Sequence, residues 1–160
     1  MYHCAYSTLP ATFDTMELIV FDLDGTLLNG NSVLSPFTQK TLAALTDRGV
    51  AYTVATGRTL HAARALIDGH GFALPQVYKN GVLIWNPSND VYAHRNFLTL
   101  DEIQHVLEAI MGEKVTPFVF TFEAGKNLAN RHAVYHPPLQ SEVEARLARE
   151  FGLREGVEVL

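Results

Sequence analysis

Short apolar runs and helical repeats alternate along the first half of the chain. Three runs rich in apolar and β-branched residues predict buried strands, and they cover residues 18–21, 51–55 and 76–78. The two intervening segments carry apolar residues three or four positions apart, which is the spacing of a helix face. Ser35 and Pro36 open the first of these helices, and Gly49 follows its end. Alternating strands and helices predict an α/β fold with a parallel sheet and right-handed crossovers.

The second half of the chain has a different, α+β pattern. Apolar segments flank the turn-forming residues 86–90 and predict a hairpin. Two pairs with the spacing of a capping box predict the starts of two helices: Thr99 with Glu102, and Ser141 with Glu144. Phenylalanine alternates with other side chains over 118–122, as in a half-buried strand, and a further strand is expected within 128–135.

The change of pattern near Gly81 divides the chain into predicted parts. Residues 1–15 lack periodicity, and we expect an irregular leader there. Residues 16–81 form the strand–helix unit, and residues 82–160 form the α+β unit. No internal repeat or low-complexity linker marks the boundary, so it rests on the pattern alone.

The composition narrows the class of protein. The 160 residues carry 12 lysine and arginine against 17 aspartate and glutamate side chains, a formal charge of −5. This acidic balance, without a basic block, argues against a nucleic-acid-binding protein. No apolar run approaches the roughly 18 residues of a membrane span, and the single cysteine cannot form an internal disulfide. We therefore expect a cytoplasmic protein that binds neither nucleic acid nor membrane.

Two aspartates stand at the end of the first predicted strand. Asp22 and Asp24 are two positions apart, so that in an extended segment both face the same reacting centre. Two carboxylates held close together can divide their roles, one acting as nucleophile and the other as acid and base. Their hard oxygen atoms suit Mg²⁺, which would relieve their repulsion. The alternative is a turn without a catalytic role, since aspartate and glycine, here Asp24 followed by Gly25, are common turn residues.

Polar residues also follow the second and third predicted strands. Thr56 and Gly57 offer a hydroxyl and an unobstructed backbone N–H before a helix, which is a natural seat for phosphate. Arg58 and Asn80 are further candidates, with a surface ion pair and a plain turn as their respective alternatives. Because the carboxyl ends of parallel strands share one edge of the sheet, we expect these clusters to converge.

These motifs resemble those of a known family. The segment Asp22-Leu23-Asp24-Gly25-Thr26-Leu27-Leu28 is similar to the first motif of the haloacid dehalogenase (HAD) superfamily. Val54-Ala55-Thr56-Gly57-Arg58 resembles the second motif of its Cof-type branch, and Asn80-Gly81 resembles the exit from core to cap in that branch. The resemblance implies a Rossmann-like core with an α+β cap, and a phosphatase acting on small phosphorylated metabolites such as sugar phosphates.

The resemblance also implies roles for individual residues. Asp22 would attack phosphorus to form an aspartyl-phosphate and would bind Mg²⁺ through its carboxylate. Asp24 would protonate the leaving alcohol, activate the hydrolytic water and lend its backbone carbonyl to the metal. Thr56 and the Gly57 N–H would hold the phosphoryl group, and Arg58 and Asn80 would face the site.

One departure from the family pattern is large. The lysine and the further acidic metal-binding motif that the family supplies after the cap are absent, and Lys79 matches no family position. The first strand would then be an exposed sheet edge, so that we expect a missing C-terminal segment or a homo-oligomer to complete the sheet. We expect impaired activity from this chain, because losing one preorganised charge contact lowers rates by roughly 10²–10³. The alternative is a non-catalytic binding or assembly module derived from such a hydrolase.

The remaining chemistry-bearing residues have plainer interpretations. Trp85 and the phenylalanine stripe at Phe118, Phe120 and Phe122 are expected to form the core of the cap rather than a stacking platform.

Overall fold

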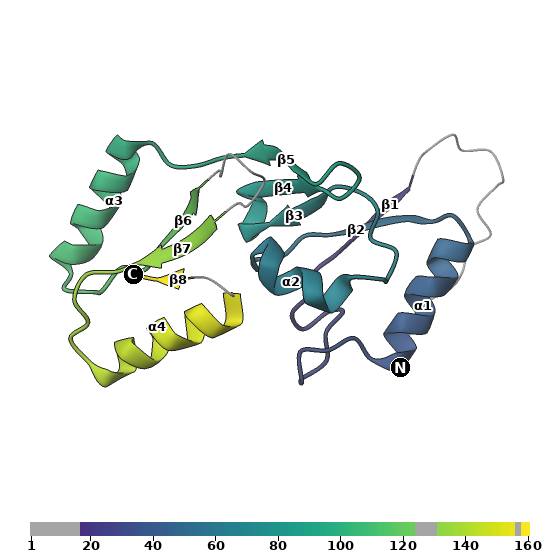
Figure 1. Ribbon diagram of the computed structural model, residues 1–160, viewed down its shortest axis with the longest axis horizontal. Helices are drawn as coiled ribbons and strands as arrows, with labels where there is room; N and C mark the ends of the chain where they lie inside the picture. Colours follow the sequence, from purple (N-terminus) through teal and green to yellow (C-terminus); the bar gives the residue numbers. More distant parts are fainter. Residues whose placement is uncertain (1–16, 124–130, 156–157) are drawn as a thin grey trace, which may run out of the picture.

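The computed structural model describes residues 17–123, 131–155 and 158–160. The leader predicted over 1–15 and the start of the strand expected within 128–135 lie outside the described residues. Figure 1 shows three neighbouring parts, with β1, β2 and α1 at one end, the sheet β3–β5 in the middle, and the sheet β6–β8 with α3 and α4 at the other end.

The first part alternates strands with helices as the pattern predicts. Its elements are β1 (Leu18–Phe21), α1 (Pro36–Asp47), β2 (Ala51–Val54), α2 (Leu60–Ile67) and β3 (Gln76–Tyr78). Helix α1 begins after Ser35, whose hydroxyl accepts a hydrogen bond from the Thr38 N–H at 3.1 Å. Thr59 caps α2 in the same way, through the Ala62 N–H. The predicted α/β order is therefore confirmed.

Strands β1 and β2 run parallel, and β3 lies beside the end of β2. Phe21 lies opposite Val54, and the Ala55 N–H donates to the Phe21 carbonyl at 2.8 Å. A bridge between Ala55 and Val77 then links the end of β2 to β3. The carboxyl ends of the three strands thus face the same edge, where the polar clusters follow them.

The second part of the chain contains two groups of antiparallel strands and two capped helices. Its elements are the single 3₁₀ turn η1 (Lys79–Gly81), β4 (Leu83–Asn86), β5 (Val91–Arg95), α3 (Leu100–Gly112), β6 (Val119–Glu123), β7 (Arg131–Tyr135), α4 (Glu142–Glu155) and β8 (Glu158–Val159). Both predicted capping boxes form, because Thr99 exchanges hydrogen bonds with Glu102, and Ser141 does so with Glu144. Strand β8, which no pattern predicted, pairs in parallel with β7.

One buried cluster crosses the position where the pattern changes. Strand β3 pairs with β4, and β4 pairs with β5, so the hairpin extends the sheet that begins before Gly81. Leu83, Trp85 and Tyr92 of this hairpin belong to the same buried cluster as Leu23 of the first part. The domain boundary at Gly81 stays a prediction, and the apolar packing runs across it.

Strand β1 has an exposed apolar flank. Among the described strands it pairs only with β2, and its side chains of Leu18 and Val20 are 51% and 53% exposed. A strand with unpaired backbone groups and apolar side chains offers a surface on which another strand can add.

The described helices include none that is long and apolar enough to cross a bilayer.

A buried contact beneath the loop after α2 gives a stability prediction. Gly71 has φ +80°, and a Cβ there would lie 2.5 Å from Thr46 Oγ1 and far too close to the Tyr52 hydroxyl. Tyr52 is nearly fully buried and donates to the His70 carbonyl at 2.8 Å, so it cannot move away without losing packing. We expect Gly71→Ala to lower the free energy of unfolding by about 3 kcal/mol, from backbone strain and overpacking together.

The matched control is Gly69→Ala. Gly69 has nearly the same backbone angle, φ +79°, but a Cβ there meets nothing within 4 Å. Urea unfolding should therefore show a loss of only about 1–2 kcal/mol for this variant. If the two variants lose the same free energy of unfolding, contacts with Tyr52 and Thr46 are not what disfavours a side chain at position 71.

Candidate active site

The end of β1 is a tight loop that exposes both aspartates. Leu23 is fully buried between Asp22 and Asp24, which are both exposed. The loop closes on itself, because the Leu27 N–H donates to the Asp22 carbonyl at 3.3 Å, while Gly25 takes φ +74°. Such a positive φ favours glycine at this position. The buried Leu23 fixes the loop on the core, and the two carboxyl groups lie on its outer side.

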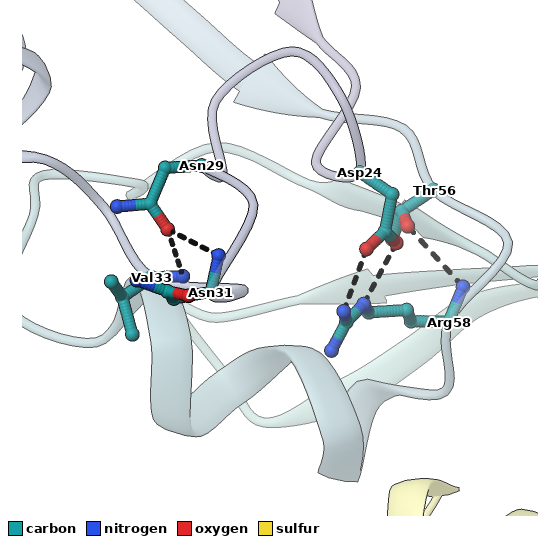
Figure 2. A network of polar contacts seen from close by, with 6 residues as sticks. All are labelled: Asp24, Asn29, Asn31, Val33, Thr56 and Arg58. Atoms are coloured by element: carbon teal, nitrogen blue, oxygen red, sulfur yellow. Dashed lines mark hydrogen bonds and ion pairs between the residues drawn. The ribbon is translucent and has the colours of Figure 1, made fainter.

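The loop continues to α1 through a second turn, visible on the left of Figure 2. Asn29 Oδ1 accepts hydrogen bonds from the N–H groups of Asn31 and Val33, at 2.9 and 3.3 Å. Asparagine stabilises turns in this way. The aspartate-bearing loop is thus held at both ends by its own backbone and side chains.

Asp24 forms a two-pronged ion pair with Arg58. Arg58 Nε lies 2.8 Å from Asp24 Oδ2, and Arg58 Nη2 lies 2.6 Å from Asp24 Oδ1 (Figure 2). The arginine side chain is 12% exposed and the aspartate side chain 56%. The paired geometry fixes the direction of both side chains. This contact joins the loop after β1 to the turn after β2, as the topology predicted.

The turn after β2 is built around Thr56. Thr56 is buried, its hydroxyl accepts from the Arg58 N–H at 3.2 Å, and its own O–H remains able to donate. Its backbone N–H donates to the Val77 carbonyl at 3.0 Å, which ties the turn to β3. Gly57 is exposed, and a Cβ there would lie 3.1 Å from Asn80 Oδ1. Gly57 therefore lets Asn80 approach the backbone closely.

The turn after β3 has an unusual backbone. Lys79, Asn80 and Gly81 all have positive φ angles, of 48°, 55° and 97°. A left-handed conformation at a residue other than glycine is strained by on the order of 1–3 kcal/mol, and such strain gathers at functional sites. Two hydrogen bonds hold this turn against the neighbouring one: the Lys79 N–H donates to the Arg58 carbonyl, and the Asn80 N–H donates to the Thr56 carbonyl, each at 3.1 Å.

A pocket of about 360 Å³ opens beside these two turns. The described residues that line it are Gly57, Lys79, Asn80, Val82, Leu83, Phe97, Phe120, Thr121, Phe122 and His132. The lining brings the turns after β2 and β3 together with β6, β7 and the segment before α3. Lys79 Nζ lies 3.8 Å from the centre of the Phe120 ring, which is a cation–π contact.

His132 is held at the wall of this pocket by Tyr92. The Tyr92 hydroxyl and His132 Nε2 are 3.4 Å apart. Burial, followed by the negative charge of Asp90, raises the pKa of Tyr92 to about 12. The hydroxyl therefore stays protonated at neutral pH and can donate a hydrogen bond to the imidazole.

The oxygen donors at the end of β1 suit a magnesium ion that has few protein ligands. Within the described ranges, no group of three or more His, Cys, Asp or Glu side chains could hold a metal. Mg²⁺ commonly keeps several waters and uses only one or two carboxylates together with substrate phosphate. An exposed Asp22 carboxylate fits that requirement, whereas both carboxylate oxygens of Asp24 are engaged by Arg58.

The structure brings most of the candidate residues together. Contacts join Asp24 to Arg58, Arg58 to Thr56, and Asn80 to both Thr56 and Gly57. Asp22 lies at the end of β1 beside this network, and its carboxylate makes no contact that places it against Thr56. The sequence analysis set Lys79 aside because it matches no family position, and it assigned Phe120 and Phe122 to the core of the cap. The structure places all three in the lining of the pocket.

The chain is similar to known proteins in sequence and in fold. The family of haloacid dehalogenase-like hydrolases matches residues 19–150. The chain is 36% identical over 89 residues to 5-amino-6-(5-phospho-D-ribitylamino)uracil phosphatase YcsE of Bacillus subtilis, a match that covers 56% of this chain and 35% of that protein. The chain thus spans about a third of the length of this curated relative.

Solved structures show the same fold at lower identity. One is a phosphatase of the haloalkanoate superfamily from Bacteroides thetaiotaomicron, with a TM-score of 0.68 at 18% identity, over 98% of this chain and 53% of that one. Another is a HAD subclass IIB sugar phosphatase, with a TM-score of 0.66 at 18% identity, over 90% of this chain and 52% of that one. With the family match over most of its length, the chain belongs to the haloacid dehalogenase-like hydrolase family.

Proposed function

We propose that this chain carries the phosphoryl-binding half of a magnesium-dependent phosphatase for small phosphorylated metabolites. The observation that carries the proposal is the joining of three strand ends by the contacts among Asp24, Arg58, Thr56 and Asn80. One edge of the sheet then carries two carboxylates, a threonine hydroxyl and an unobstructed glycine N–H. These are the functional groups that phosphoryl transfer requires.

In the proposed reaction, Asp22 is the nucleophile. Its carboxylate oxygen attacks phosphorus, a P–O bond to Asp22 forms, and the P–O bond to the leaving alcohol breaks. Asp24 gives the departing oxygen its proton. Thr56 and the Gly57 N–H hold the phosphoryl oxygens while charge develops on them.

The second step releases phosphate from Asp22. Asp24, now ionised, takes a proton from a water molecule, whose oxygen attacks phosphorus and displaces the Asp22 carboxylate. Asp24 is thereby protonated again, and inorganic phosphate leaves. The Arg58 fork holds the ionised form of Asp24, so that the Asp24 side chain must leave arginine when it takes up this proton.

Magnesium fits this proposal through oxygen ligands. The Asp22 carboxylate and the Asp24 backbone carbonyl would hold the ion, and the remaining ligands would be water and substrate. When bound, the ion neutralises charge on the phosphoryl group and on the nucleophile.

The relatives support a phosphorylated, sugar-like substrate. One is named for the hydrolysis of 5-amino-6-(5-phospho-D-ribitylamino)uracil, and one structural neighbour is a sugar phosphatase. Among the described strands, β1 pairs only with β2. We propose that a further segment or a second copy pairs with the exposed edge of β1 and that this chain by itself turns over slowly.

A binding module without turnover is the second candidate. The observation that favours it is the Asp24–Arg58 ion pair, because a carboxylate engaged through both oxygens must leave arginine before it can exchange protons with substrate. Incubation of the full-length gene product with Mg²⁺ and a panel of sugar phosphates distinguishes the two. Phosphate release supports the phosphatase, whereas saturable binding without release supports the module.

A substitution at Gly57 tests the phosphate seat. A methyl group there would lie 3.1 Å from Asn80 Oδ1, so that the Asn80 side chain or the turn that carries the Gly57 N–H must shift by a few tenths of an ångström. We expect Gly57→Ala to weaken binding of ribose 5-phosphate about tenfold, since one charge-assisted hydrogen bond to backbone is lost or misaligned. Isothermal titration calorimetry measures the change.

Gly30→Ala is the control for this variant. Gly30 lies in the loop after β1, and a Cβ there meets nothing within 4 Å. Its affinity for ribose 5-phosphate should match that of the unmodified protein. If Gly57→Ala binds as tightly as Gly30→Ala, phosphate does not use the turn after β2.

A further inference from the structure

The ion pair between Asp24 and Arg58 has one fixed partner and one exposed partner. The Arg58 side chain is 12% exposed, whereas the Asp24 side chain is 56% exposed. The backbone of Arg58 is held on both sides, because its N–H donates to Thr56 Oγ1 at 3.2 Å and its carbonyl accepts from the Lys79 N–H at 3.1 Å. The next residue, Thr59, is fully buried and caps α2. The carboxylate can therefore move into solvent while the arginine stays in place.

Departure of the carboxylate is unfavourable for the arginine. A guanidinium with so little contact with water depends on nearby anions for its stability. When Asp24 leaves, the two hydrogen bonds of the fork, at 2.6 and 2.8 Å, are lost together. A second anion that offers two oxygens to the fork can replace them, and phosphate binds arginine in this way as carboxylate does. An incoming phosphoryl group is such an anion.

Arg58 lies beside the position proposed for the phosphoryl group. It directly follows Gly57, which is exposed and whose N–H belongs to the proposed phosphate seat. Figure 2 shows the guanidinium, the Asp24 carboxylate and Thr56 in one group. In the proposed reaction Asp24 gives a proton to an oxygen bonded to phosphorus, so the carboxylate and the phosphoryl group are neighbours. A guanidinium that holds this carboxylate is then next to the phosphoryl group as well.

We propose that Arg58 exchanges partners when substrate binds: phosphoryl oxygens replace the Asp24 carboxylate on the guanidinium, and Asp24 becomes available for proton transfer. The inference rests on the proposed function and adds a control step to it. Without a phosphoryl group, arginine holds Asp24 as an anion, so that Asp24 neither protonates a leaving group nor activates water. Phosphate binding and release of Asp24 are then coupled, and removal of the carboxylate must strengthen phosphate binding.

Inorganic phosphate measures this coupling without hydrolysis. NMR titration of the full-length gene product in Mg²⁺-free buffer gives the dissociation constant of phosphate, even where binding is weak. We expect Asp24→Asn to bind phosphate about tenfold more tightly than the unmodified protein, because an amide carries no charge with which to compete for arginine, and a hydrogen bond to a charged group contributes about that factor. In the unmodified protein the signal of the Arg58 Nε–H group should shift on addition of phosphate, since its hydrogen-bond acceptor changes.

The same substitution in an Arg58→Gln protein separates exchange of partners from charge repulsion. Repulsion between Asp24 and phosphate is present in both backgrounds, whereas competition for arginine exists only where arginine is present. With glutamine at position 58, we expect Asp24→Asn to raise the phosphate affinity by no more than about threefold, the usual size for an exposed charge. Asp47→Asn removes an exposed carboxylate at the end of α1 and should change neither affinity.

The outcomes separate this inference from the function on which it rests. If Asp24→Asn raises the affinity equally in both backgrounds or not at all, or if phosphate leaves the Arg58 Nε–H signal in place, the exchange of partners is overturned while the phosphate seat stands. If phosphate binds to none of these proteins, the proposed function fails as well. A gain in affinity that depends on arginine, together with the shift of the Arg58 signal, supports the exchange.

Discussion

Asp22→Asn should reduce phosphatase activity of the full-length gene product by at least about a thousandfold. An amide nitrogen and oxygen replace the carboxylate, so that no good nucleophile remains at the end of β1 and no covalent intermediate can form. Release of p-nitrophenol from p-nitrophenyl phosphate in the presence of Mg²⁺ measures the loss. Thermal unfolding should change little, because Asp22 is exposed.

Asp47→Asn provides the control for the loss of one carboxylate. Asp47 is exposed at the end of α1, and the change alters the net charge by the same amount. This variant should keep its activity. An Asp22→Asn protein that hydrolyses p-nitrophenyl phosphate as fast as Asp47→Asn would remove Asp22 from the mechanism.

Asp24→Asn should lower the rate by about 10²–10⁴, the usual contribution of general acid–base catalysis. The size of the loss should depend on the alcohol that leaves. A sugar alkoxide needs a proton as it departs, whereas p-nitrophenolate is stable without one. We therefore expect a larger loss of kcat with ribose 5-phosphate than with p-nitrophenyl phosphate, and steady-state kinetics with both substrates measures the difference.

Arg58→Lys separates this role from the ion pair. Lysine keeps the charge beside Asp24 but cannot form the fork that arginine makes at 2.6 and 2.8 Å. The rate should fall only about three- to tenfold, and by the same factor for both substrates. If Asp24→Asn shows the same uniform loss, Asp24 only positions Arg58, and another group supplies the proton.

Local sequence patterns predicted the elements well where a physical signal lies within a few residues. Strands β1 and β3 form at the predicted residues. Strand β1 is an apolar run that ends at Asp22, and β3 carries the β-forming residues Val77 and Tyr78 before the polar turn at Lys79. Strand β2 ends at Val54, one residue earlier than predicted, since Ala55 instead bridges to Val77. The two-residue strand β8 is too short to carry a periodic signal, and its pairing with β7 depends on tertiary contacts.

The site was predicted in part for the same reason. Strand topology brings Asp24, Thr56 and Asn80 to one edge, so their convergence follows from where each strand ends. The position of the pocket wall does not follow from the strand ends. Phe97 and Phe120 come near Lys79 only because the segment before α3 and the sheet β6–β8 pack there. The alternating pattern of residues 118–122 shows that one face of β6 is apolar, but not that part of this face lines a pocket.

The shared strand β3 connects the first part of the protein to the hairpin β4–β5. Backbone hydrogen bonds tie β3 to the turn after β2 on one side, and strand pairing ties it to β4 on the other. Asn96 is still held, since its N–H donates to the Val82 carbonyl at 2.8 Å. Contacts of Tyr92 with Phe122 and of Lys79 with Phe120 then join the sheet β6–β8 to this framework. A shift of β3 would therefore be felt both at the turn that carries Thr56 and at the phenylalanine side of the pocket.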